Sequence, residues 1–340
     1  MKIAFFDTHH FDKDMFLETN KRFNFPIEFF ETRLNKKTAG LARGHEVVCC
    51  FVNDKLDADC IAELKDGGVK LIALRCAGFN QVDLVACDKA GLKVAIVPGY
   101  SPYAVAEFTV GLLLSLNRKI HRAYSRVRDH NFSLDGLVGF DLYGKTVGIV
   151  GAGKIGKIFA HIMLSFGCQV LIHDPHEDEE LKKNPGVKFL SLPDVCRNAD
   201  VISLNVPLNP KTYHLINKDL FSLMKDGVYI INTGRGALID SLALIDALKS
   251  EKVRGAALDV YEEEESVFFQ DLSDKMLKDD VLARLLTFPN VLITSHQAFL
   301  TREALSNIAT STLESVQEFE NTGVISGGKS VNAECCVRVK

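Results

Sequence analysis

Three glycines at a fixed spacing are the feature that most constrains how this 340-residue chain can fold. Gly151, Gly153 and Gly156 follow the apolar run TVGIV and precede a segment with helical periodicity. The first glycine permits a tight turn, the second lets a ligand approach the main chain, and the third lets helix and strand pack closely. The pattern therefore predicts a strand, a glycine turn and a helix that belong to an α/β fold with a parallel sheet.

The ligand that this turn predicts is a dinucleotide, because the start of the helix offers unpaired N–H groups and partial positive charge to a pyrophosphate. Asp174 ends the next predicted strand, in LIHDPH, where its carboxylate can accept hydrogen bonds from ribose hydroxyls and repel a 2'-phosphate. The expected cofactor is therefore NAD rather than NADP. Two alternatives stay open: a glycine turn kept only for packing, and a methyltransferase that binds S-adenosylmethionine with a similar turn.

Alternating strands and helices divide the chain into two expected domains. Apolar runs alternate with helix-like segments before Pro98, and a second alternation runs from Lys145 to His296. Strands that alternate with helices form parallel sheets through right-handed crossovers. The expected fold class is α/β, with two Rossmann-like parallel-sheet domains and a cleft between them. A last helix, residues 302–320, can return to the first domain. We therefore expect a discontinuous substrate (catalytic) domain, residues 1–100 plus 300–340, and an NAD-binding Rossmann domain, residues 101–299.

Composition argues against several classes of partner. The formal net charge is -4 and the basic residues are dispersed, so nucleic acid is not expected. The longest apolar stretch, residues 105–116, is shorter than the roughly 20 residues that span a bilayer, so no membrane partner is expected. Nine cysteines without Cys-x-x-Cys spacing predict reduced thiols and no metal site. Together with the lack of a signal-peptide pattern, they predict a cytoplasmic protein.

Three residues of the second domain could form a site for hydride transfer to a ketone. Such a site needs a cation that holds the oxygens, an acid for the developing alkoxide, and a group that keeps this acid protonated. Arg235 in IINTGRGALID and His296 after VLITS both follow predicted strands, and Glu264 belongs to an acidic run. Each alone has an ordinary explanation: a surface ion pair, a structural imidazole, a solvated face. Their combination favours catalysis, because a carboxylate stabilises a protonated imidazole.

Four motifs in the same order resemble the D-isomer-specific 2-hydroxyacid dehydrogenases. They are GAGKIG, NTGRGALID, GAALDVYEEE and SHQAF, and the resemblance covers nearly the whole chain. Within the family, segments such as RCAGFNQVD, VPGYSP and SHQAFLT are most similar to the fermentative D-lactate dehydrogenases of bacteria. The chain departs from the family at YEEEES, where a proline often separates the acidic residues. The separation of Asp259 and Glu264 is nevertheless kept.

The resemblance implies a role for each residue of the site. Arg235 would bind the substrate's carboxylate and keto oxygen, His296 would donate the proton, and Glu264 would orient His296. Cofactor contacts would be made by Gly151, Gly153, Ile155, Gly156, Asp174, Val206, Pro207, Thr212, Thr233, Gly234, Arg235 and Asp259. Substrate contacts would be made by Ala77, Gly78, Phe79, Tyr100, Arg235 and Phe299, with Phe51 beside them. Phe51, Tyr100 and Phe299 could equally be ordinary core.

The expected activity is the reversible, NADH-dependent reduction of pyruvate to D-lactate, by a homodimer or homotetramer. Two other functions remain open. A sibling enzyme would act on another small 2-keto acid, such as glyoxylate or hydroxypyruvate. A corepressor-like protein of the same fold would sense NAD and bind peptides without turnover. The complete set of Arg, Glu and His favours turnover.

Overall fold

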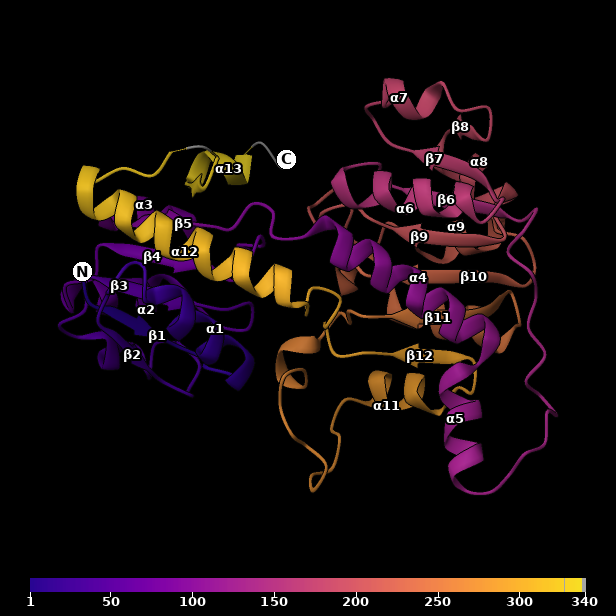
Figure 1. Cartoon of the computed structure of the whole chain (residues 1–340), viewed down its shortest axis with the longest axis horizontal. Helices are drawn as coiled ribbons and strands as arrows, with labels where there is room; N and C mark the ends of the chain where they lie inside the picture. The colour runs from indigo at the N-terminus through magenta and orange to yellow at the C-terminus, as the bar shows by residue number, and fades with distance from the viewer. Residues whose placement is uncertain (327, 338–340) are drawn as a thin grey trace. The chain divides into compact units, whose positions relative to one another are not determined.

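The computed structural model in Figure 1 describes residues 1–326 and 328–337. The chain forms two compact units, Met1–Ser101 with Leu300–Lys340 and Pro102–Phe299. Each unit has a sheet of its own, so the α/β class with two parallel-sheet domains is confirmed. None of the helices in the described part is long and apolar enough to cross a membrane.

The first unit is built on a six-stranded sheet with the order β13-β5-β4-β3-β1-β2. Strands β1 to β5 are parallel, and β13 pairs antiparallel with β5. Every residue of β1, β3 and β4 is buried, as expected for parallel strands that are covered on both faces. The strands are β1 (Ile3–Phe5), β2 (Ile27–Phe29), β3 (Val47–Cys50), β4 (Leu71–Leu74), β5 (Lys93–Ala95) and β13 (Ser330–Val331).

The C-terminal part of the chain belongs to this first unit. Helix α12, drawn in yellow in Figure 1, packs against α1 and β4. The sequence suggested only a weakly apolar tail after this helix. Instead, Val331 is buried and extends the sheet by one short edge strand. The helices are α1 (His10–Asn20), η1 (Ala39–Ala42), α2 (Ala58–Asp66), α3 (Leu84–Ala90), α12 (Arg302–Thr322) and α13 (Ala333–Val337).

The second unit is built on a seven-stranded parallel sheet with the order β12-β11-β10-β9-β6-β7-β8. The chain proceeds outward from β6 to β8, then returns to place β9 on the other side of β6. Ligands of such sheets bind where the strand order reverses, at the carboxyl ends of the strands. The strands are β6 (Thr146–Val150), β7 (Gln169–His173), β8 (Val187–Phe189), β9 (Val201–Leu204), β10 (Val228–Asn232), β11 (Val253–Leu258) and β12 (Val291–Ile293).

Helices cover both faces of this sheet. The expected long helix after Ser101 is confirmed as α4, and it packs with α6 in one core cluster. Four short helices, α8 to α11, join the later strands and were not recognised from periodicity, because each has only six to nine residues. Each begins at a capping side chain that accepts a main-chain N–H. The helices are α4 (Pro102–Arg118), α5 (Ile120–Arg128), α6 (Lys154–Ser165), α7 (Glu179–Lys182), α8 (Leu192–Asn198), α9 (Lys218–Leu223), η2 (Gly236–Leu238), α10 (Ser241–Lys249), η3 (Glu264–Ser266) and α11 (Asp280–Thr287).

Candidate active site

The glycine turn joins β6 to α6 at the point where the strand order reverses. Gly151 has φ +94°, and a Cβ on Gly156 would lie 2.0 Å from the carbonyl oxygen of Gly151, so both positions require glycine. A Cβ on Gly153, in contrast, would meet nothing within 4 Å. Gly153 is the N-cap of α6 and has no side chain to satisfy the free N–H groups of the helix. The turn therefore leaves space and donors for an anionic ligand.

Asp174 follows β7 directly and lies beside this turn. Its Oδ2 accepts the N–H of Ala152 at 2.7 Å, and its Oδ1 accepts the N–H of His176 at 2.8 Å. These bonds fix the carboxylate next to the glycines. Because each carboxylate oxygen can accept more than one hydrogen bond, the group can still bind hydroxyls of a ligand.

The loop after β9 supplies the residues expected on the adenosine side. Val206 contacts the glycine turn: its Cγ1 would lie 2.7 Å from a Cβ on Gly151. The hydroxyl of Thr212 donates to the carbonyl oxygen of Pro207 at 2.7 Å, which closes the loop. Since β9 neighbours β6, this loop and the glycine turn flank the same strand ends.

The loop after β10 carries Arg235. The side chain of Asn232 holds this loop: its Nδ2 donates to the carbonyl oxygen of Arg235 at 2.9 Å, and its Oδ1 accepts the N–H of Gly234 at 3.0 Å. One guanidinium nitrogen of Arg235 donates to the carbonyl oxygen of Gly234 at 2.8 Å. A guanidinium has five N–H donors, so others remain for a ligand. Thr233 precedes Gly234 in this loop, and its buried hydroxyl lies 2.9 Å from the hydroxyl of Thr109 in α4.

His296 and Glu264 form a direct pair. Nδ1 of the imidazole lies 2.7 Å from Oε1 of the carboxylate, and the two side chains are only 16% and 15% exposed. Oε2 of Glu264 accepts the N–H of Tyr261 at 3.0 Å, which fixes the carboxylate. With Nδ1 engaged, Nε2 is the ring nitrogen that can exchange a proton with a ligand.

The acidic run 262–265 divides its side chains between two histidines. Oε1 of Glu262 lies 2.6 Å from Nε2 of His214, and its Oε2 accepts the hydroxyl of Ser241 at 3.1 Å. Glu264, two residues later, is the glutamate that contacts His296. The departure from the family pattern at YEEEES therefore does not separate this pair.

The loops of Arg235 and Glu264 touch each other. A Cβ on Gly236 would lie 2.0 Å from the carbonyl carbon of Tyr261, so glycine is required for the two loops to approach. The three predicted catalytic residues thus follow neighbouring strands β10, β11 and β12 of one sheet. Local sequence signals had indicated each strand end, and the parallel topology places these ends at one edge.

Asp259 holds the segment that carries His296, a function that the sequence did not reveal. Its buried carboxylate accepts the hydroxyl of Thr294 at 2.6 Å and the N–H groups of Gln297 and Ala298, each at 2.9 Å. The carbonyl oxygen of Asp259 accepts the N–H of His296 at 2.7 Å. Burial raises the pKa of Asp259. These bonds hold His296 at φ +54°, a conformation that non-glycine residues seldom adopt. A contact of Asp259 with nicotinamide stays a prediction.

The residues expected to bind substrate lie mainly in the first unit. Ala77, Gly78 and Phe79 follow β4, and their N–H groups have no acceptor among the residues that the structure describes. The carbonyl oxygen of Tyr100 accepts a hydrogen bond from Asn307 of α12 at 2.7 Å. The remaining expected residue, Phe299, is buried at the end of the second unit.

A buried charge cluster in the first unit was missed by sequence reasoning. Arg75, immediately after β4, is fully buried, and its Nε donates to Asp12 at 3.1 Å. Its guanidinium carbon lies 4.3 Å and 4.5 Å from the ring centroids of Phe5 and Phe51. Asp54 accepts the N–H of Phe51 at 2.6 Å. Phe51, an expected pocket residue, is therefore held twice: Arg75 packs on its ring, and Asp54 accepts its main-chain N–H.

Known 2-hydroxyacid dehydrogenases are similar to this chain over most of its length. A family model described as D-isomer specific 2-hydroxyacid dehydrogenase, NAD binding domain, matches residues 110–298. The 2-hydroxyacid dehydrogenase homolog 1 of Schizosaccharomyces pombe is 53% identical over 320 residues, which cover 94% of this chain and 96% of that protein. The D-lactate dehydrogenase of Escherichia coli is 50% identical, with coverage of 94% and 97%. The solved apo-structure of D-lactate dehydrogenase from Escherichia coli has a TM-score of 0.88, at 47% identity and coverage of 97% and 100%.

The family match identifies the ligand of the glycine turn. The matched range lies within the second unit, where Gly153 leaves space at the start of α6 and Asp174 stands beside it. The expected cofactor, NAD, is confirmed, and the methyltransferase and packing alternatives are excluded. The chain belongs to the D-isomer-specific 2-hydroxyacid dehydrogenases, NAD-dependent oxidoreductases that act on 2-hydroxy and 2-keto acids.

Proposed function

We propose that this protein is a D-lactate dehydrogenase that reduces pyruvate reversibly with NADH. The observation that carries the proposal is the 2.7 Å contact between Nδ1 of His296 and Oε1 of Glu264, at the same sheet edge as Arg235 and the glycine turn. The relative in Escherichia coli named D-lactate dehydrogenase, 50% identical to this chain, supports pyruvate as the substrate.

The second unit would hold the cofactor, which supplies the hydride when it is bound. Gly153 and Ile155, at the start of α6, would hold the pyrophosphate with main-chain N–H groups. Asp174 would bind the adenosine ribose and disfavour a 2'-phosphate. The remaining contacts would come from the loops at the same edge, at Gly151, Gly156, Val206, Pro207, Thr212, Thr233, Gly234, Arg235 and Asp259.

His296 would supply the proton to the keto oxygen through Nε2. Glu264 would keep the imidazole protonated and oriented, because a carboxylate in hydrogen-bond contact favours the charged ring. Arg235 would bind the substrate's carboxylate and polarise its keto oxygen, since a guanidinium presents parallel N–H donors to oxygen pairs. In the reverse direction, neutral His296 would accept the proton of the hydroxyl.

The first unit would bind the carboxylate end of the substrate. The N–H groups of Ala77, Gly78 and Phe79 support this role, because they have no acceptor among the described residues. Three N–H groups in succession can form an anion-binding turn. Phe51, Tyr100 and Phe299 would bound the pocket and limit it to small 2-keto acids.

A homo-oligomer, dimeric or tetrameric, is part of the proposal, and so is a cytoplasmic location. Helix α5 has no buried residue, and the segment after it exposes further large apolar side chains. Exposed apolar surface of this kind is typical of protein interfaces. The exposed side chains are Ile120, Tyr124, Val127, Phe132, Leu134, Val138 and Tyr143. The cysteines whose side chains are described are free thiols, as expected in a reducing compartment.

A series of 2-keto acids tests the proposed substrate. Rates of NADH oxidation would be measured with pyruvate, glyoxylate, hydroxypyruvate and a larger branched 2-keto acid. The proposal predicts the highest kcat/KM for pyruvate. A higher value for another member of the series would identify a sibling enzyme, and oxidation with none of them would favour the NAD-sensing alternative.

A further inference from the structure

The second unit contains a cavity of about 490 Å³ at the edge of its sheet opposite to the candidate active site. Tyr229 lines it from the start of β10, and Val253 and Arg254 line it from the start of β11. Thr233 follows the other end of β10, about 13 Å away at the usual rise of a strand. The cavity has the size of an ordinary small-molecule site, roughly 300–1,000 Å³. It is therefore separate from the edge where NAD binds.

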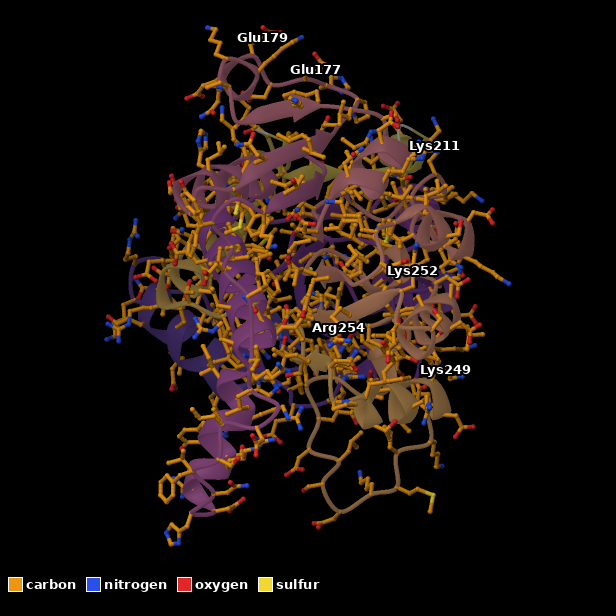
Figure 2. The ribbon with its side chains drawn as sticks, turned by 90° about the vertical axis from the view of Figure 1, so that its right-hand side faces the viewer. Glu177, Glu179, Lys211, Lys249, Lys252 and Arg254 are labelled. Atoms are coloured by element: carbon orange, nitrogen blue, oxygen red, sulfur yellow. The ribbon has the colours of Figure 1, made fainter. Side chains whose placement is uncertain are left out.

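The lining of this cavity combines apolar walls with an excess of positive charge. Lys119, Arg122, Lys249 and Arg254 line it, whereas Glu251 is the single lining carboxylate. The excess of three positive charges contrasts with the net charge of -4 of the whole chain. Figure 2 shows Lys249 and Arg254 on the face of the molecule that it turns toward the viewer. The apolar lining residues are Leu116, Tyr229, Leu248, Val253, Phe288 and Pro289.

Two of these cations are bonded to carbonyl oxygens rather than to carboxylates. Nζ of Lys119 donates to the carbonyl oxygen of Val138 at 2.6 Å, and Nη1 of Arg122 donates to that of Pro289 at 3.3 Å. Partial burial and the nearby charges of Arg122 and Arg254 lower the pKa of Lys119. The cations therefore repel one another, and these carbonyl contacts do not neutralise them.

The other two lining cations lie near a carboxylate but are not hydrogen-bonded to it. Nζ of Lys249 lies 3.8 Å from Oδ1 of Asp246, which is outside the lining. Oε2 of Glu251 lies 3.8 Å from Nη1 of Arg254, which is too long for a hydrogen bond. Burial lowers the pKa of His121, although a hydrogen bond with the main chain of Ser115 opposes the shift. The positive charge of the cavity therefore comes from its lysines and arginines.

We propose that this cavity binds a small polyanion, a molecule with two or more phosphate or carboxylate groups on a compact body. The guanidinium groups of Arg122 and Arg254 would bind oxyanions through paired N–H donors, and Lys119 would bind them as a point charge. The apolar walls would contact the body of the ligand. Lys119 is the N-cap of α5, and Arg122 lies in the first turn of this helix. Because the exposed apolar side chains of α5 belong to the proposed subunit interface, the ligand would bind next to that interface.

Isothermal titration calorimetry with inorganic pyrophosphate and with citrate tests the proposal. The full-length protein would first be saturated with NADH, so that the glycine turn cannot bind the added anion. We expect one binding site per chain, and the probe that binds more tightly distinguishes a phosphate site from a carboxylate site. The double substitution Lys119→Ala and Arg122→Ala should weaken binding by about tenfold or more, because it removes two charge-assisted contacts.

Two further variants keep this test decisive. Lys218→Ala removes an exposed cation at the start of α9, outside the cavity, and should bind the anion like the parent protein. Arg254→Gln removes one lining charge at similar volume and should weaken binding even if the double variant folds poorly. Saturation with neither anion, or equal affinities in the parent, Arg254→Gln and Lys218→Ala, would overturn the proposal.

Discussion

Nδ1 of His296 lies 2.7 Å from Oε1 of Glu264, and the main chain of His296 is bonded to Asp259. The imidazole is thus held through its ring by one carboxylate, while a second, fully buried carboxylate organises the residues after it. The first carboxylate favours the protonated ring and the second fixes its position. The two acids therefore have different effects, which substitutions can separate.

Replacing Glu264 with Gln should move the decline of pyruvate reduction to lower pH, by about one pH unit or more. The amide keeps the size of the side chain but lacks the charge that stabilises the imidazolium. The measurement is the pH profile of kcat/KM. Glu263→Gln, in the same acidic run but exposed, should keep the parent profile. An unshifted profile for Glu264→Gln would show that this carboxylate does not sustain the acid.

Replacing His296 with Ala should lower kcat for pyruvate reduction by about 10² to 10⁴, the usual contribution of a general acid. NADH binding, followed by fluorescence, should remain close to that of the parent, because the glycine turn and Asp174 are unchanged. His161→Ala provides the control, since this exposed histidine of α6 lies on the helix beyond its first turn. A rate equal to that of the parent would remove His296 from the mechanism.

Replacing Asp174 with Asn should shift cofactor preference from NADH toward NADPH. The ratio of the two kcat/KM values should change by roughly tenfold or more, because a charged acceptor for the ribose is lost and a 2'-phosphate is no longer repelled. Steady-state rates with both cofactors give this ratio. Glu179→Gln, at an exposed residue of α7, should leave this ratio unchanged. An unaltered ratio in Asp174→Asn would place cofactor selection elsewhere.

The stability of the first unit should depend on the protonation of Asp54. Burial raises the pKa of Asp54 to about 7, although Arg75 and two main-chain N–H groups oppose the shift. Since this pKa exceeds the ordinary value of 3.8 for an aspartate, the carboxyl's contribution to stability is present below about pH 4 and is lost as pH rises through about 7. Urea unfolding should therefore show a fall in stability across this range.

Asp54→Asn tests this dependence. It should destabilise the protein less at about pH 8 than at about pH 5, because the parent carries the buried charge only at the higher pH. The loss of one acceptor for the N–H of Leu34 or Phe51 adds a cost that does not vary with pH. Asp66→Asn, at the exposed end of α2, should show no such change between the two pH values. Equal destabilisation by Asp54→Asn at both would contradict the assignment.

Much of the second unit could be predicted because its signals are local. The glycine turn has separate steric requirements within six residues, and Asp174 directly follows the next strand. Arg235 and His296 could be selected because parallel strands bring their carboxyl ends to one edge. For Glu264, the choice within an acidic run needed the resemblance to a family. No property of the run itself distinguishes it from Glu262, which pairs with a different histidine.

Other features could not be predicted, because they depend on partners that are distant in sequence. Asp259 acts through main-chain N–H groups nearly 40 residues away, and main-chain donors leave no pattern in a sequence. Arg75 is buried against Asp12 of helix α1 and against the ring of Phe51, which follows β3. The cationic cavity likewise combines the end of α4 with the starts of β10 and β11.

The most direct test of the proposed activity is the reaction of the purified protein with pyruvate and NADH, followed by chiral analysis of the product. We expect NADH to be oxidised in proportion to the lactate formed, and this lactate to be the D-enantiomer. Formation of L-lactate, or no oxidation of NADH with pyruvate, would contradict it.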